Sequence, residues 1–207
     1  MRFLWLFLPI AMALLRLITG KYIFSALVSL ACAAIIPFSD APFVVIGLLL
    51  SVVGDYLLAH QKGHPNRFLC GVAFFGLAHL AFIAFAARRF VLSPAALAVL
   101  LALAALYAVY LARRVLPGQG MPMRIALSGY AFVSLLGLFF ALSMKAPHPA
   151  EYWLYAAGIA SIVFSDTMIA EAEFVHHRWA NRLILPTYYL CHILLAASQI
   201  AARLFTP

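Results

Sequence analysis

The chain has 207 residues, of which 67% are hydrophobic and only 10% are charged, and its mean hydropathy is +1.05. A soluble core of this size does not need so much apolar surface, so the composition excludes a soluble domain and predicts an all-α, polytopic membrane protein. The net charge of +8 is assigned to loops, because no basic cluster carries the interleaved aromatics or glycines of a nucleic-acid module, and no nucleic-acid partner is expected.

Eight apolar runs, separated by Gly, Pro, His or charged residues, predict eight transmembrane helices in one transmembrane domain over residues 1–207. The first run begins like a signal peptide, but it continues past its small residues to Ile18, so we interpret it as the first span. The predicted spans are Phe3–Ile18, Tyr22–Ile36, Phe43–Ala59, Phe68–Ala87, Val91–Leu111, Met123–Met144, Trp153–Ala170 and Leu183–Leu204.

An even number of spans places both termini on the same side of the membrane, and the distribution of basic residues predicts which side. Nine of the 14 Lys and Arg residues fall in the loops that follow odd-numbered spans, and the other five fall on the side of the termini. We therefore expect the odd-numbered loops in the cytoplasm and both termini outside, with a bacterial inner membrane as the location.

Two aspartates lie within predicted spans in similar local sequences. Asp55 follows Gly54 and Asp166 follows Ser165, and in both cases two residues, an aliphatic residue and Ala come next. A charged side chain in the middle of a membrane helix costs about 3 kcal/mol on insertion scales, so such residues usually carry a function. The alternative is that each aspartate is only a buried hydrogen-bonding anchor.

The spacing of the two aspartates is typical of an internal repeat. They are separated by 111 residues and four spans, so both helices run toward the cytoplasm and the acids are expected at one depth. His79 follows Asp55 by 24 residues, and His192 follows Asp166 by 26. We therefore consider two parallel four-helix repeats, residues 1–89 and 90–207, related by an axis along the membrane normal.

The third and fourth predicted spans carry further polar candidates. Gly47, Ser51 and Asp55 recur every four residues, and such a stripe suits either close helix packing or the wall of a cavity. His79 either bonds to a neighbouring helix or is a partner of Asp55 or of a substrate.

The last predicted span groups two tyrosines with a histidine. Tyr188, Tyr189 and His192 lie on one helical face, which Gln199 continues. Tyrosines near a membrane interface are often ordinary belt residues, so Tyr188 and Tyr189 are assigned either to the belt or to a site.

Other chemistries find little support in the sequence. There is no HExxH pattern, and the three cysteines are scattered without CxxC spacing, so no metal and no cofactor is predicted. No GxSxG elbow indicates a serine esterase. Intramembrane aspartyl proteases have Gly-x-Gly-Asp on one helix, whereas Val52 occupies the position of the first glycine here.

Four segments, in this order and spacing, carry a resemblance to a known family. The chain resembles the lysoplasmalogenase family, the YhhN-like group of small eight-helix membrane proteins. Lys21 matches a lysine of that family loosely, and His192 falls where many relatives carry Gln. The matching segments are Leu50–Leu58, Phe74–Phe85, Val163–Ala170 and Leu185–Leu190.

The resemblance implies hydrolysis of the vinyl-ether bond of a lysoplasmalogen, giving a fatty aldehyde and glycerophospho-ethanolamine or -choline. Vinyl ethers cleave by protonation of the alkene, so the reaction needs one neutral carboxylic acid and one carboxylate, and two nearby aspartates sharing a proton provide both. We predict Asp55 and Asp166 as the catalytic pair. Substrate contacts are predicted for Lys21, Ser51, His79, Ser165, Tyr188, Tyr189 and His192.

A different class of function fits the same features. Parallel repeats and buried aspartates are also typical of a small proton-coupled transporter or lipid carrier. Under either reading the expected partners are a lysophospholipid and membrane lipid, and the oligomeric state is not predicted.

Overall fold

A computed structural model describes residues 2–62 and 64–205. These residues form eight α-helices, a short 3-10 helix and a π-helical turn, and they contain no strand beyond an isolated bridge between Phe90 and Met144. Residue 1 and residues 206–207, the ends of the expected domain, lie outside the described part. The elements are η1 (Arg2–Leu6), α1 (Phe7–Thr19), α2 (Ile23–Ile35), α3 (Pro42–Ala59), α4 (Pro65–Ala87), α5 (Pro94–Tyr110), η2 (Leu111–Val115), α6 (Met121–Leu142), α7 (Pro149–Glu173) and α8 (Asn181–Phe205).

The all-helical prediction is confirmed, and the chain is an integral membrane protein. Six helices of the described residues, α3 to α8, are long and apolar enough to cross a membrane. The apolar helices at Phe3–Thr19 and Ile23–Ile35 are shorter than the about 20 residues that a full crossing needs. A count of eight crossings therefore stays a prediction.

Prolines set where most of the helices begin. Helices α3 to α7 each have Pro at the first or second position, where its missing N–H removes no helical hydrogen bond. Ser93 also caps α5 by accepting from the amide of Ala96. Helix α5 therefore starts at Pro94 and not at the predicted Val91. Helix α7, Pro149–Glu173, is longer than predicted at both ends.

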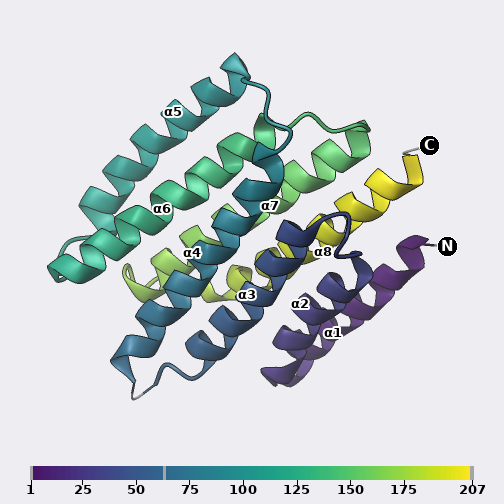
Figure 1. Cartoon of the computed structure of the whole chain (residues 1–207). Coiled ribbons are helices and arrows are strands. Elements are labelled where there is room, and N and C mark those ends of the chain that lie inside the picture. Colours follow the sequence, from purple (N-terminus) through teal and green to yellow (C-terminus); the bar gives the residue numbers. More distant parts are fainter. Residues whose placement is uncertain (1, 63, 206–207) are drawn as a thin grey trace.

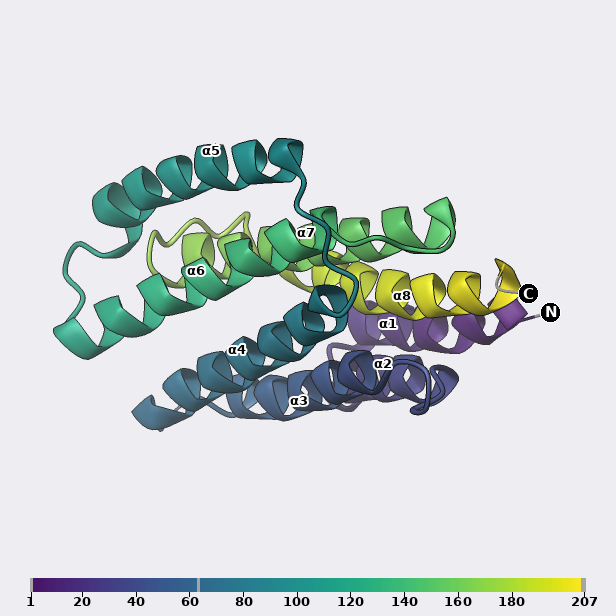
Figure 2. The same cartoon turned by 45° about the horizontal axis from the view of Figure 1, so that its top comes forward.

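The helices alternate in direction, and the described ends of the chain lie close together at one end of the bundle (Figures 1 and 2). Which side of the membrane this end faces stays a prediction. The closest pairs are α3 with α4 and α7 with α8. Glycines allow this approach: a Cβ on Gly47 would lie 2.3 Å from the ring of Phe82, and one on Gly158 would lie 3.3 Å from the carbonyl oxygen of Cys191.

The two halves of the chain are joined by matching contacts. Helix α4 of the first half packs on α6 of the second, and α8 of the second half packs on α2 of the first. Helix α5 stands apart and packs mainly on α6 (Figure 2). The contacts α4–α6 and α8–α2 are those that a two-fold repeat produces, and the repeat itself stays a proposal.

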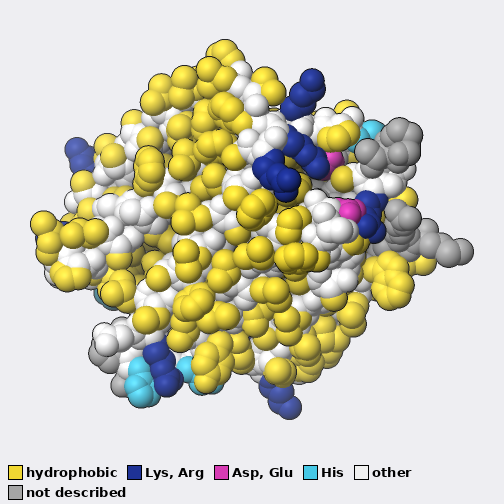
Figure 3. Space-filling model, viewed as in Figure 1, with side chains coloured by type: hydrophobic (Ala, Val, Ile, Leu, Met, Phe, Trp, Pro, Cys, Tyr) yellow, Lys and Arg dark blue, Asp and Glu magenta, His cyan; other side chains and the backbone are white. Residues whose placement is uncertain are grey.

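The surface agrees with a lipid environment. Hydrophobic side chains cover most of the face in Figure 3, whereas Lys and Arg lie in small groups, several of them toward the ends of the bundle. Many large apolar side chains are exposed, including Ile18, Leu101 and Phe132.

At the end of the bundle near the termini, ion pairs tie loops to helices. Arg203 of α8 bonds to Asp40 between α2 and α3 at 2.6 Å, and buried Glu151 pairs with Arg89. The hydrogen bond from Ser39, and then the one from Arg203, lower the pKa of the Asp40 carboxyl below its ordinary value.

Candidate active site

Both membrane aspartates line one cavity of about 270 Å³. Residues of all eight α-helices and of η2 build its wall, and it lies toward the end of the bundle where the odd-numbered helices finish. Asp55 comes from α3 and Asp166 from α7. In the described part of the chain no hydrogen bond joins the two carboxyl groups, and each has its own set of partners.

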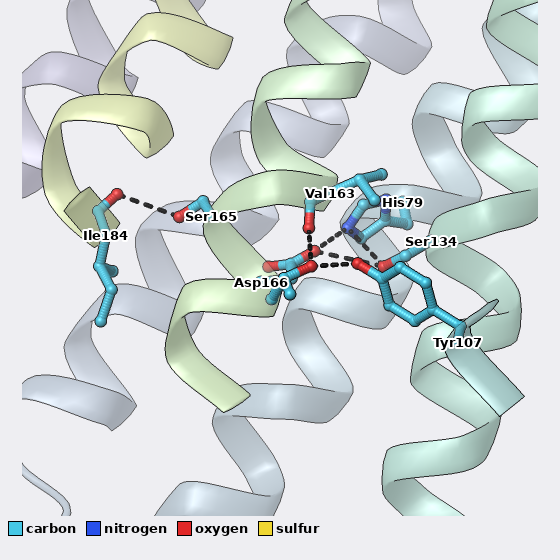
Figure 4. A network of polar contacts seen from close by, with 8 residues as sticks. His79, Tyr107, Ser134, Val163, Ser165, Asp166 and Ile184 are labelled. Atoms are coloured by element: carbon cyan, nitrogen blue, oxygen red, sulfur yellow. Dashed lines mark hydrogen bonds and ion pairs between the residues drawn. The ribbon is translucent and has the colours of Figure 1, made fainter. Parts of the chain in front are cut away.

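Asp166 accepts two hydrogen bonds at one oxygen. His79 Nε2 lies 3.0 Å from its Oδ2, and the Ser134 hydroxyl donates to the same atom at 3.2 Å (Figure 4). His79 is completely buried, and its Nδ1 has no partner. We assign the proton to Nε2, because a buried N–H without an acceptor costs more than a bare lone pair. His79 therefore donates to Asp166, whose side chain is 14% exposed.

Aromatic residues complete the wall beside Asp166. The hydroxyl of Tyr107 on α5 pairs with that of Thr167, which also bonds back to the Val163 carbonyl. The ring of Tyr130 on α6 meets His79 edge-on at 5.5 Å. Through this hydrogen bond Tyr107 joins α5 to α7 next to Asp166 (Figure 4).

Asp55 has a different partner. The hydroxyl of Tyr188 on α8 donates to its Oδ2 at 2.9 Å. Tyr188 is held between Phe75 and His192, with ring centroids at 5.8 and 4.3 Å. His192 is fully buried and bonds through Nδ1 to Ser29 of α2 at 2.9 Å. Tyr188 and His192 of α8 therefore link Asp55 on α3 to Ser29 on α2.

Comparison with known proteins now identifies the family. The YhhN family model matches residues 4–199, which include all of the helices that form the cavity. The chain belongs to the YhhN family. This family includes lysoplasmalogenases, so the predicted resemblance is confirmed. No curated protein and no solved structure matches the chain significantly.

Within this YhhN protein, the predicted site residues fall into two groups. Four of them line the cavity, namely Asp55, Ser165, Asp166 and Tyr188. The hydroxyl of Ser165 nevertheless points to the carbonyl of Ile184 at 3.0 Å, away from Asp166 (Figure 4).

The other predicted contacts lie behind the wall or outside it. Ser51 is buried and donates to the Gly47 carbonyl, as a packing stripe would require. The Tyr189 hydroxyl pairs with Ser25 at 2.8 Å, and Lys21 is exposed in the α1–α2 turn.

Of the alternatives for His79, the bond to a neighbouring helix is confirmed, and the pairing with Asp55 is wrong. His79 bonds to Asp166 of the other half instead, because its ring packs against Gly137 and Tyr130 of α6, which leads it toward α7. It does not line the cavity, so it orients Asp166 from behind and is not placed to touch a substrate there.

Several lining residues were not identified from the sequence. Tyr107, Tyr110 and Tyr130 look like ordinary membrane tyrosines, and Ser134 lies in an apolar run without a pattern around it. Arg16, at the end of α1, was counted with the loop charge and was not singled out by number as a site residue. The signal in the sequence that could have identified Arg16 is its position, because it lies before the end of the apolar run and a loop cation would follow that end.

Among the described residues, no group of three or more His, Cys, Asp or Glu side chains forms a metal-binding cluster. Cys32 and Cys191 are buried within the helix packing, and Cys70 is exposed. The polar groups that face the cavity are therefore carboxyl, hydroxyl, amide and guanidinium groups.

Proposed function

We propose that this YhhN protein hydrolyses the vinyl-ether bond of a lysoplasmalogen, releasing a fatty aldehyde and glycerophospho-ethanolamine or -choline. The observation that carries the proposal is the pair of aspartates from α3 and α7 that line one cavity among apolar helices. Membership of a family that includes lysoplasmalogenases supports the same reaction.

The chemistry explains why two carboxyl groups are needed. A proton adds to the alkene carbon farther from the ether oxygen, and the positive charge spreads over the adjacent carbon and oxygen. Water adds to that carbon and loses a proton, which gives a hemiacetal. The hemiacetal breaks its bond to the glycerol oxygen, which leaves with a proton, and the carbonyl of the aldehyde forms. The first step requires a general acid, and the second requires a general base.

The hydrogen bonds divide these roles between the two aspartates. Asp166 accepts from both His79 and Ser134, and two donors on one oxygen favour the carboxylate that takes a proton from water. Among the described residues Asp55 accepts a side-chain hydrogen bond only from Tyr188, so we assign it as the acid that protonates the alkene. The proton taken up by Asp166 then returns to Asp55, which restores the starting state.

Aldehyde release tests this proposal directly. Purified protein in detergent is supplied with an alkenyl lysophospholipid, and Asp55→Asn and Asp166→Asn are each expected to lose about 100-fold or more in rate, the usual contribution of an acid or base. Asp40→Asn is the matched control, since it makes the same change at an exposed aspartate outside the cavity.

Two results would contradict the hydrolase. The first is wild-type protein that releases no aldehyde from alkenyl lysolipids. The second is aspartate variants that retain the full rate of release. Uptake of intact lysolipid into sealed vesicles without product would instead support the transporter alternative.

A further inference from the structure

Arg16 is the one Lys or Arg among the described residues that line the cavity. It lies in the last turn of α1, and its side chain is partly buried. Tyr22 and Ser25, just beyond the same turn, also line the cavity. A single cation placed in a largely apolar cavity calls for an explanation, because charged groups are costly there unless they are paired.

The guanidinium of Arg16 has room for a further partner. Its Nε is buried and has no hydrogen bond, and no carboxylate of the described residues lies within ion-pair distance of it. The group lies near the Tyr189 hydroxyl and interacts electrostatically with Asp55. A buried donor of this kind is normally satisfied, and the planar guanidinium group fits the oxygens of a phosphate.

Other arginines of the protein show the contrast. Arg89 pairs with Glu151, Arg203 with Asp40, and Arg67 donates to the His60 carbonyl. These side chains are bonded to the protein itself and do not line the cavity. Arg16 combines a place in the cavity wall with an unsatisfied buried donor.

We propose that Arg16 binds the phosphate of a lysophospholipid head group at the cavity. This rests on the proposed function and deepens it, since it explains why the substrate carries a phosphate and how the lipid is oriented. With the phosphate at Arg16, the glycerol backbone extends into the cavity that holds Asp55 and Asp166. Lys21, for which the sequence predicted a substrate contact, is exposed and is not among the residues that line the cavity.

A binding experiment tests this without any turnover. The probes are a 1-O-alkyl lysophosphoethanolamine, which has no vinyl ether, the matching 1-O-alkylglycerol, which has no phosphate, and inorganic phosphate. In Arg16→Gln, affinity for the alkyl lysophospholipid is expected to fall about 10- to 100-fold, while affinity for the alkylglycerol is unchanged. Arg16→Lys is expected to fall between Gln and wild type, because it keeps the charge but loses the fork.

Two controls make the result specific. Arg124→Gln removes an exposed arginine at the start of α6, whose side chain donates to the Gln119 carbonyl outside the cavity, and it is expected to bind both lipids like wild type. Inorganic phosphate that binds as tightly as the lysolipid would identify a free-phosphate site and overturn the head-group assignment. A thermal melt confirms that each variant is folded.

The same variants can be compared in aldehyde release from an alkenyl lysophospholipid and from a 1-alkenylglycerol. Arg16→Gln is expected to raise KM for the first substrate only. Equal losses on both substrates would mean that Arg16 serves Asp55 and not a phosphate, and no loss on either would also overturn the proposal. If wild-type protein releases no aldehyde, the proposed function fails, while the binding experiment still decides the role of Arg16.

Discussion

The surroundings of Asp55 and Asp166 are built alike but end differently. In each case the fourth helix of the opposite half supplies the partner: α8 brings Tyr188 to Asp55, and α4 brings His79 to Asp166. Each of these helices also carries a histidine that forms a hydrogen bond with a serine: His192 with Ser29, and His79 with Ser134. One difference is that Tyr188 stands between His192 and Asp55, whereas His79 bonds to Asp166 directly.

Under the proposed repeat and the proposed reaction, this difference would give two similarly placed acids different roles. Two carboxyl groups in identical surroundings have no reason to take different roles. Here His79 and Ser134 both donate to Asp166, whereas Asp55 receives a single phenol. In the proposed reaction, these hydrogen-bond donors would separate the roles of acid and base.

The strongest test of this division is chemical rescue. Asp166→Asn and Asp55→Asn should both lose about 100-fold or more in rate. Formate added at neutral pH is ionised and can replace a base, so it is expected to restore part of the rate in Asp166→Asn and little in Asp55→Asn. The measurement is aldehyde release against formate concentration, and rescue of Asp55→Asn alone would reverse the assignment.

A smaller effect separates the two histidines. His79→Phe removes a hydrogen bond to a carboxylate, worth about 1.5–3 kcal/mol, so kcat is expected to fall about 10-fold or more with KM nearly unchanged. His192→Phe removes only the bond to Ser29, and its loss in kcat is expected to stay below about threefold.

Melting temperatures for the two variants accompany these rates, since both rings are fully buried. Equal losses in kcat that follow equal losses in melting temperature would show that both histidines are only structural.

The smallest effect concerns Asp40, an aspartate outside both clusters. Its folded pKa is lowered by Ser39 and Arg203, so its bonds stabilise the fold above the ordinary carboxyl pKa of about 4, and this contribution is lost as the pH falls through the lowered value. Asp40→Asn is expected to lower the melting temperature slightly at pH 7, and the difference from wild type is expected to shrink as the pH falls below about 4. A larger difference at pH 3 than at pH 7 would contradict this sign.

The sequence predicted those features that depend on hydropathy and spacing. The helices and the placement of Asp55 and Asp166 at the same end of their helices are of this kind. Helix limits were less accurate, because α7 continues as helix to Glu173 beyond its apolar run, and because Pro94 and not the apolar run sets the start of α5.

The partners of the aspartates were not predictable in the same way. The partner of His79 was left open between a neighbouring helix, Asp55 and a substrate, because sequence spacing says nothing about which helices pack together. Ser134 and Tyr107 acquire a role only through the contacts of α6 and α5 with the site. Arg16 was grouped with loop charges because hydropathy does not distinguish a cation at a helix end that faces inward from one that faces water.

Each aspartate has a hydrogen-bond partner from the other half of the chain, so residues 1–89 and residues 90–207 each lack one of these partners. Asp166 would lose His79 if the second half stood alone, and Asp55 would lose Tyr188 if the first half did. Under the proposed function, two fragments cut in the loop between α4 and α5 would each be inactive, and mixing them would have to rebuild both acid clusters at once. The two halves therefore depend on each other, and a substitution of His79 on α4 is expected to change the surroundings of Asp166 on α7.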